Sequence, residues 1–191
     1  TSFAGHAYDL ANQLDFNGYD GMIVIGGDGT MHEIINGMLM RKDKKQLPVG
    51  LIPGGTGNSF MHDLGLLDPV DAVNVIINGT KRTIDVAELS MNNIKKYAFN
   101  IVGWGLVTDV GNKAEQWRWL GEARYTLLSV YEVFKYKSRP AKLILDDDTI
   151  IDDFTFIIGC NTMHTGKGMK MAPKSELDDG LIDVVVVRHG P

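Results

Sequence analysis

Two glycine-rich segments contain the residue types in this sequence that are best suited to chemistry. Residues 26–30 read Gly-Gly-Asp-Gly-Thr and residues 53–59 read Pro-Gly-Gly-Thr-Gly-Asn-Ser, and each follows a short apolar run. Glycines at the end of a buried strand let the backbone approach a ligand closely, and the amides that open the next helix attract an anion. Two such phosphate-sized cradles on one sheet edge suggest a nucleotide site. Neither segment has the Walker A or the G-x-G-x-x-G spacing, so an ordinary P-loop or dinucleotide fold is not supported.

Asp28 lies in the middle of the first segment, where a carboxylate would repel a phosphate. The repulsion is relieved if a cation bridges the two groups, or if the carboxylate takes a proton from an attacking group, and both roles are catalytic. The simpler alternative is that Asp28 caps the helix that ends near Leu39. Thr56 and Asn58 likewise either donate hydrogen bonds to phosphate oxygens or satisfy the start of their own helix.

Strand and helix patterns alternate around these two segments. The apolar runs at 22–25 and 49–52 are typical of strands buried on both faces. Apolar residues at helical spacing mark residues 7–14, 31–39, 60–64 and 70–77. Strand, glycine turn and helix, twice in succession, predict a parallel α/β sheet.

The second half of the chain has a different pattern. Strand-like runs at 83–89, 97–103, 141–145, 150–160 and 181–187 are joined in several places by short polar turns, while residues 104–137 look helical. Runs of strands joined in this way favour an antiparallel sheet. We therefore expect an α/β fold with an N-terminal parallel sheet carrying the nucleotide loops in residues 1–85, followed by a β-rich domain in residues 86–191.

The composition excludes several classes of protein. The 191 residues carry a formal net charge of -5, whereas a sequence-independent nucleic-acid binder needs a basic surface. No apolar run approaches the roughly 20 residues that span a bilayer, and the first residues lack the pattern of a signal peptide. The single cysteine, Cys160, lies in an apolar stretch and is expected to be a buried small hydrophobic residue in a reducing compartment.

The two glycine-rich segments resemble the motifs of a known family. Gly-Gly-Asp-Gly-Thr-Met-His-Glu at 26–33 and Pro-Gly-Gly-Thr-Gly-Asn at 53–58 are similar to the catalytic domain of diacylglycerol kinases and sphingosine kinases. Further motifs at 103–110, 120–127, 164–173 and 177–183 look like the eukaryotic sphingosine and ceramide kinase branch. The resemblance covers nearly the whole chain and implies a lipid kinase that uses ATP and Mg²⁺.

The resemblance also implies roles for individual residues. Asp28 would be the base that deprotonates the lipid hydroxyl, Asp109 would contact the lipid, and Asp179 would hold a structural Mg²⁺. ATP would be bound by Thr1, Gly27, Gly29, Thr30, Gly55, Thr56, Gly57, Asn58, Arg118 and Arg124. An oxygen ligand on a tight turn suits Mg²⁺, and arginine forks suit phosphate. The plain alternatives are an Asp-Gly turn at Asp179 and a solvated helix face for the arginines.

Two departures from the family pattern limit what the resemblance implies. The acidic residue that binds the substrate's amine in animal sphingosine kinases corresponds here to Gly111, and Asp109 lies two positions earlier. Sphingoid bases, ceramide and diacylglycerol are therefore all open as substrates. The family's opening strand and a late acidic motif would lie outside the printed sequence, so we expect a truncated second domain and a segment that needs its missing ends for catalysis.

Alternatives of other kinds also stay open. An NAD kinase shares the Gly-Gly-Asp-Gly motif, and a nucleotide-binding regulatory module without turnover would keep the same loops. The apolar residues between Trp104 and Tyr136 form either ordinary core or a lipid slot or membrane-facing flap. For the lipid kinase we expect a cytoplasmic protein with peripheral membrane association, a lipid substrate at the membrane surface, no nucleic-acid partner and, as an open point, a homodimer.

Overall fold

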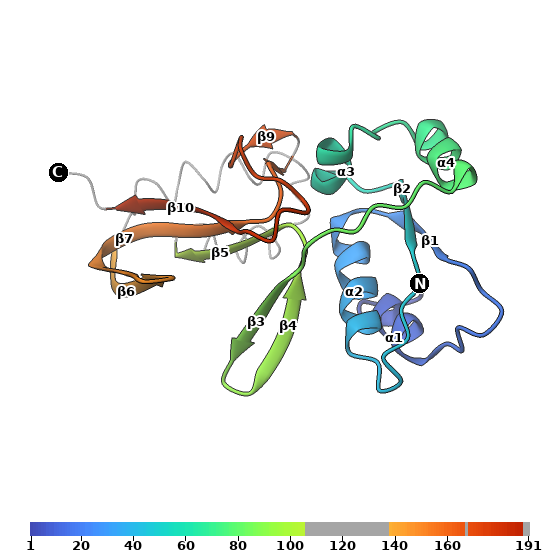
Figure 1. The fold of residues 1–191 in the computed structure, drawn as a ribbon, viewed down its shortest axis with the longest axis horizontal. Helices are drawn as coiled ribbons and strands as arrows, with labels where there is room; N and C mark the ends of the chain where they lie inside the picture. The colour runs from blue at the N-terminus through green and yellow to red at the C-terminus, as the bar shows by residue number, and fades with distance from the viewer. Residues whose placement is uncertain (106–137, 167, 189–191) are drawn as a thin grey trace. The chain divides into compact units, whose positions relative to one another are not determined.

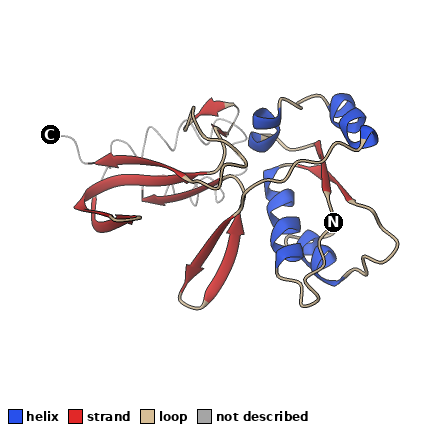
Figure 2. Ribbon diagram, in the orientation of Figure 1, coloured by secondary structure: helices blue, strands red, loops and turns tan. Residues whose placement is uncertain are grey.

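The computed structural model describes residues 1–105, 138–166 and 168–188, which fall into two compact units. The first unit comprises residues 1–101 and 160–183, and the second comprises 102–159 and 184–191. Figure 2 shows that the described helices all belong to the first unit, whereas the described part of the second consists of strands and loops. The fold is thus mixed α/β, with a parallel sheet and antiparallel sheets, as the sequence predicts.

A parallel pair of strands places the two glycine-rich segments in the first unit. Strands β1 (Met22–Gly26) and β2 (Val49–Pro53) pair in parallel, and the register aligns Gly26 with Pro53. Both strands therefore end at the same edge, and both glycine loops leave from it (Figure 1). The surrounding helices are α1 (His6–Gln13), α2 (Asp28–Leu39), α3 (Ser59–Leu64) and α4 (Pro69–Asn78).

The core of the first unit lies between these helices and strands. Helices α1 and α2 pack side by side, which Gly37 allows because a Cβ atom there would collide with the carbonyl oxygen of Tyr8 (Figure 1). The buried side chains of the core come from every helix of the unit and include Ala11, Val24, Ile34, Leu51, Met61, Ala72 and Phe99. Their burial removes apolar surface from water, which is the main favourable term in folding.

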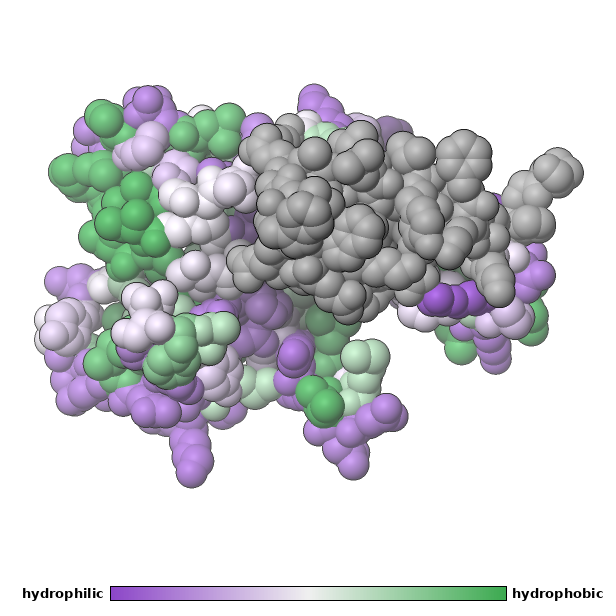
Figure 3. Space-filling view, turned by 180° about the vertical axis from the view of Figure 1, so that it is seen from behind, coloured by the Kyte–Doolittle hydropathy of each residue, from purple (hydrophilic) through white to green (hydrophobic). Residues whose placement is uncertain are grey.

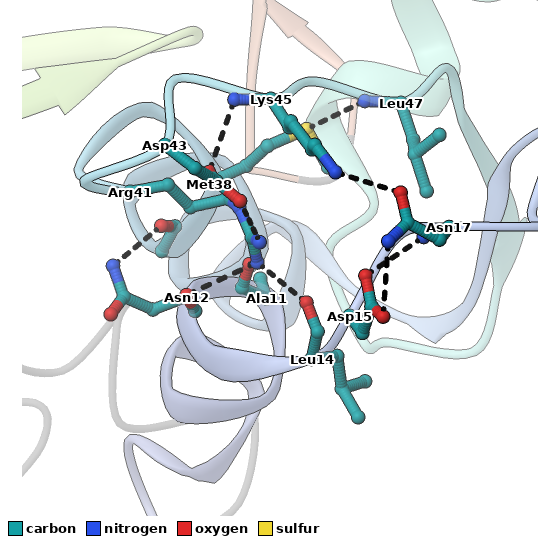
Figure 4. A network of polar contacts seen from close by, with 11 residues as sticks. Ala11, Asn12, Leu14, Asp15, Asn17, Met38, Arg41, Asp43, Lys45 and Leu47 are labelled. Carbon is teal, nitrogen blue, oxygen red and sulfur yellow. Dashed lines mark hydrogen bonds and ion pairs between the residues drawn. The ribbon is translucent and has the colours of Figure 1, made fainter.

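A buried arginine fixes the end of α1. The Arg41 Nη1 atom donates hydrogen bonds to the carbonyl oxygens of Ala11, Asn12 and Leu14, at 3.0, 3.1 and 2.9 Å (Figure 4). The same guanidinium forms a two-point ion pair with Asp43 and lies 3.9 Å from the centroid of the Phe16 ring. The last carbonyls of a helix have no partner within the helix, so Arg41 supplies one and ties α1 to the end of α2.

One face of β1 is exposed, which differs from the expected strand buried on both faces. Val24 is buried, but Ile23 and Ile25 are 61% and 75% exposed. Exposed apolar residues of α4, Val70 and Ile77, lie on the same unit, and Figure 3 shows hydrophobic side chains gathered on its surface. The expectation of double burial is therefore wrong for β1, because a continuous apolar run does not reveal which of its two faces is covered.

The first unit also contains two small antiparallel pairs. These are β3 (Ala87–Met91) with β4 (Ile94–Ala98), and β8 (His164–Thr165) with β9 (Met169–Lys170). The strand expected at 97–103 is broken at Phe99 and Asn100. Phe99 turns into the core and meets Phe60 edge to face at 5.1 Å between ring centroids. The break therefore has a packing cause that strand propensity does not show.

The described part of the second unit is built on a four-stranded sheet. Its strands are β5 (Ile101–Gly105), β6 (Arg139–Leu145), β7 (Asp148–Cys160) and β10 (Asp183–Arg188), in the order β10-β7-β5 with β6 paired to β7. The β6–β7 hairpin is antiparallel, as expected. The domain boundary expected at 85/86 stays a prediction. The helical pattern expected at 104–137 lies outside the described residues from 106 onward, and no described helix is long and apolar enough to cross a membrane.

Candidate functional site

Asp28 does not cap its own helix. Gly27 is the N-cap of α2, and Asp28 is the first helical residue. Its carboxylate instead accepts hydrogen bonds from the backbone N–H groups of Ser59, at 2.8 Å, and Phe60, at 3.0 Å. These are the first two residues of α3, so Asp28 satisfies the free donors that open the neighbouring helix. The own-helix alternative is therefore wrong, and the carboxylate joins the two glycine loops to each other.

A third donor reaches the same carboxylate from the strand region. The side-chain amide of Asn100 donates from Nδ2 to Oδ1 of Asp28 at 3.2 Å. Asp28 is half-buried, and the three donors together fix the orientation of its carboxylate. Sequence analysis did not single out Asn100. The one available signal is a polar residue within the strand-like run 97–103.

The two glycine loops touch through their backbones. The N–H of Gly54 donates to the carbonyl oxygen of Gly26 at 2.8 Å, which extends the parallel ladder by one bond. One residue further on, a Cβ atom on Gly27 would lie 2.9 Å from the Cα atom of Gly55. Real Cβ atoms do not come so close to backbone, so only glycine fits. Sequence analysis predicts two adjacent loops, and here they are in direct contact.

The polar groups of Asn58 shape the second loop. Asn58 accepts a hydrogen bond from the N–H of Gly55, at 3.0 Å, and donates to the carbonyl oxygen of Gly55, at 2.8 Å. Its φ angle of 48° places it in the left-handed region, which asparagine tolerates better than most residues. A Cβ atom on Gly57 would lie 3.7 Å from Oδ2 of Asp28, so this loop borders the carboxylate.

Other candidate residues of the two loops present open surface. Thr56 and Gly29 are exposed, and a Cβ atom on Gly29 would meet no atom within 4 Å. The side chain of Thr30 lies over Gly26, where a Cβ atom would come 2.9 Å from its hydroxyl oxygen. Thr1 is exposed, and no hydrogen bond or ion pair among the described residues joins it to either loop. Asp109, Arg118 and Arg124 lie outside the described residues.

A second carboxylate of α2 caps another helix. Glu33 accepts hydrogen bonds from the N–H groups of Gly5 and Ala7, at 3.0 and 3.2 Å, at the start of α1. Asp28 and Glu33, five residues apart on one helix, thus anchor the N-termini of two different helices. Both acids of the motif at 26–33 therefore have a structural role, because each satisfies backbone donors at the start of a neighbouring helix. Asp28 differs because its carboxylate borders the second glycine loop.

An aspartate-histidine pair holds the loop at 163–166 against α3. Asp63 is 5% exposed at its side chain and accepts hydrogen bonds from the N–H groups of Met163 and His164, at 2.7 and 3.1 Å. Its Oδ2 atom also lies 3.1 Å from Nδ1 of His164. Ser59 adds a hydrogen bond from its hydroxyl to the carbonyl oxygen of Gly166, at 3.1 Å. The loop is therefore fixed to the same helix that Asp28 caps.

Asp179, the candidate metal ligand, and Asp85 both accept hydrogen bonds from the backbone of the turn at 180–181. Oδ1 of Asp179 accepts from the N–H of Leu181, at 2.9 Å, and Oδ2 of Asp85 accepts from the N–H of Gly180, at 2.7 Å. Next to them, the ion pair with Arg82 lowers the pKa of Asp178. Carboxylate oxygens are the ligand type that Mg²⁺ prefers. In the described ranges, however, no three acidic, histidine or cysteine residues cluster as a metal site.

Comparison with known proteins identifies the family. The family model described as the diacylglycerol kinase catalytic domain matches residues 1–89, and the model described as the YegS C-terminal NAD kinase beta sandwich-like domain matches residues 100–191. The chain belongs to the diacylglycerol kinase and sphingosine kinase family. This confirms the resemblance that the glycine motifs carry.

Individual members of this lipid kinase family support the assignment. Sphingosine kinase 2 of Arabidopsis thaliana is 34% identical over 100% of this chain and 50% of its own length. A diacylglycerol kinase of Mycobacterium tuberculosis is 30% identical over 96% of this chain and 61% of its own. A crystal structure of a diacylglycerol kinase from Bacillus anthracis matches 98% of this chain and 60% of that one, with 26% identity and a TM-score of 0.75. The chain therefore spans about half to three-fifths of the length of these relatives.

Proposed function

We propose that this chain is the catalytic region of an ATP-dependent lipid kinase, which transfers the terminal phosphoryl group of ATP to a lipid hydroxyl. The observation that carries the proposal is the position of Asp28. Its carboxylate is oriented by three donors, and it lies where two contacting glycine loops open. A general base must be held in place and must reach the proton that it takes, and this arrangement supports both requirements.

In this proposal Asp28 takes the proton of the lipid hydroxyl. The hydroxyl oxygen then forms a bond to the terminal phosphorus, the bond from that phosphorus to the bridging oxygen breaks, and the electron pair leaves with ADP. The residues of this chain supply position and charge stabilisation, which are the main protein contributions to phosphoryl transfer.

The loops offer a cradle with the right chemistry for a nucleotide. Gly27, Gly29 and Thr30 of the first loop and Gly55, Thr56, Gly57 and Asn58 of the second would line the phosphates. The close Gly27–Gly55 contact keeps side chains out of this space, and the start of α2 favours negative charge. Because Asn58 bonds with Gly55, its first task is to set the loop shape. Thr1, Arg118 and Arg124 are proposed as further contacts of the ATP phosphates.

Magnesium and the lipid complete the proposal. Mg²⁺ would neutralise negative charge, and Asp179 with the nearby Asp85 is the proposed structural site, on the strength of its hard oxygen donors. Asp109 is proposed on the lipid side. The proposed substrate is a sphingoid base, ceramide or diacylglycerol. The protein would be cytoplasmic and would bind peripherally to the membrane that holds this lipid. Whether it forms a homodimer is left open.

Radiolabelled phosphate transfer tests the proposal. The 191-residue chain, and a version extended at both ends to the length of the relatives, are incubated with labelled ATP and sphingosine, ceramide, diacylglycerol or NAD. We expect a labelled lipid from the extended form. Labelled NADP with no labelled lipid would replace the proposal by an NAD kinase. ATP binding without any product from either form would replace it by a regulatory nucleotide-binding module.

A further inference from the structure

We propose that Asn100 is a positioning residue that holds the Asp28 carboxylate for proton transfer; this inference rests on the proposed kinase function. Asn100 lies 72 residues from Asp28 in sequence, at the break between β4 and β5. It is the one side chain among the described residues that donates a hydrogen bond to this carboxylate, because the other two donors are backbone N–H groups.

The chemistry of the contact fixes which way the Asn100 amide points. A carboxylate oxygen accepts hydrogen bonds, so the amide nitrogen must face Asp28 and the amide oxygen must face away. That oxygen, Oδ1 of Asn100, is buried and has no hydrogen-bond partner in the described part of the chain. Buried oxygens without a partner are rare, because desolvation without a hydrogen bond is costly. The orientation that lets the amide nitrogen donate to Asp28 therefore leaves the amide oxygen without a hydrogen-bond partner among the described residues.

Asn100 is itself held in a rigid frame. Its carbonyl oxygen accepts a hydrogen bond from the N–H of Asn161, at 2.8 Å. The side chain of Asn161 donates to the carbonyl oxygens of Phe99 and Asp85, at 2.9 Å each. The ring of Phe99 in turn packs edge to face on Phe60 of α3. Because the backbone of Asn100 is fixed on both sides, its amide can define the position of the Asp28 carboxylate.

A positioning role makes a specific kinetic prediction. In the extended protein, Asn100→Ala removes a hydrogen bond to a charged group, and we expect kcat to fall about tenfold while the KM values for ATP and lipid stay within about twofold. Asn100→Asp places a second carboxylate beside Asp28, and a nearby negative charge raises the pKa of a carboxyl group. We therefore expect the acidic limb of the kcat–pH profile to move to higher pH. Asn74→Ala, at an exposed position of α4, is the matched control and is expected to behave as wild type.

A second measurement does not depend on activity. In ¹⁵N-labelled protein, a side-chain amide proton of Asn100 that is bonded to a carboxylate is expected to exchange slowly with water. In Asp28→Ala it is expected to exchange at least tenfold faster. The side-chain amide signal of Asn100 is assigned by its absence from the spectrum of Asn100→Ala. Thermal unfolding shows whether each variant folds.

The outcomes separate this inference from the proposed function. Slow exchange that depends on Asp28, together with the kcat loss, supports the positioning role. An unprotected Asn100 amide overturns it, whatever the activity, and so does a folded Asn100→Ala protein with wild-type kcat. If the amide is protected but the wild-type protein phosphorylates no lipid, the contact between Asn100 and Asp28 exists. The proposed kinase function is then overturned, and with it the positioning role of Asn100 in catalysis.

Discussion

A Cβ atom on Gly55 would lie 2.6 Å from the Cα atom of Gly27. This contact brings the backbones of two loops together although the residues are 28 positions apart. It exists because β1 and β2 are paired in parallel and in a register that ends both strands at the same edge. Asp28 borders the second loop at Gly57. A substitution at Gly55 therefore tests the contact between the loops and leaves the Asp28 carboxylate in place.

We predict that Gly55→Ala weakens ATP binding by at least tenfold. The added methyl group meets the backbone of Gly27 and Oδ1 of Asn58, at 2.6 and 2.8 Å, so the two loops must move apart. Overpacking of this kind costs roughly 1–3 kcal/mol. Gly29→Ala meets no atom within 4 Å and is not expected to lower the unfolding temperature. It is a control for stability alone, because Gly29 itself lines the proposed phosphate site. Titration with a fluorescent ATP analogue and thermal unfolding measure the two effects, and equal ATP affinity of Gly55→Ala and wild type would contradict the account.

The fold could be predicted further than the site. The runs at 22–25 and 49–52 and the glycines after them indicate parallel strands with loops at one edge, since both signals are local in sequence. The donors to Asp28 are not local. Which N–H groups it reaches depends on how α3 lies against α2, and Asn100 reaches it from 72 residues away.

The exposed face of β1 could not be predicted from the sequence for a related reason. Ile23 and Ile25 belong to the same apolar run as Val24, and hydrophobicity does not show which face is covered. Asn100 shows the converse limit. A single asparagine inside a strand-like run reads as a weak strand residue, whereas the structure gives it a specific partner. Asp28, in contrast, can be identified from the sequence, because its charge conflicts with a phosphate cradle.

The Arg41–Asp43 ion pair makes stability depend on pH. Its hydrogen bond to Arg41 lowers the pKa of Asp43 from 3.8 to about 2. A lowered pKa in the folded state gives stability that is present above the unfolded value and lost as the pH falls through the folded value. We therefore expect Asp43→Asn to melt at a lower temperature than wild type at pH 6, and the difference to shrink between pH 4 and pH 2.

Thermal unfolding of both proteins across this pH range provides the measurement. Protonation of the other acids is common to the two proteins and cancels in the difference. A difference that is constant from pH 6 to pH 2 would show that the charge of Asp43 does not stabilise the folded state. Asp20→Asn, at an exposed position before β1, is the matched control.

Asp63 is predicted to hold the loop at 163–166. Removing its carboxylate in Asp63→Ala leaves the N–H groups of Met163 and His164 without their acceptor, which costs about 2 kcal/mol. Hydrogen exchange is expected to rise in residues 163–166 and to stay unchanged in α1. Exchange that rises equally in both regions would indicate general destabilisation in place of a local anchor.

The central claim is that Asp28 acts as a base, and Glu33 offers a matched comparison on the same helix. Both carboxylates cap a neighbouring helix, but Asp28 borders the second glycine loop and Glu33 contacts α1. The most direct measurement is therefore kcat for lipid phosphorylation in the extended protein with Asp28→Asn and with Glu33→Gln, each checked for folding by thermal unfolding. The account predicts that Asp28→Asn lowers kcat by about 10²–10⁴-fold, the range for general base catalysis, whereas Glu33→Gln keeps kcat within about threefold. A folded Asp28→Asn protein with wild-type kcat would contradict it.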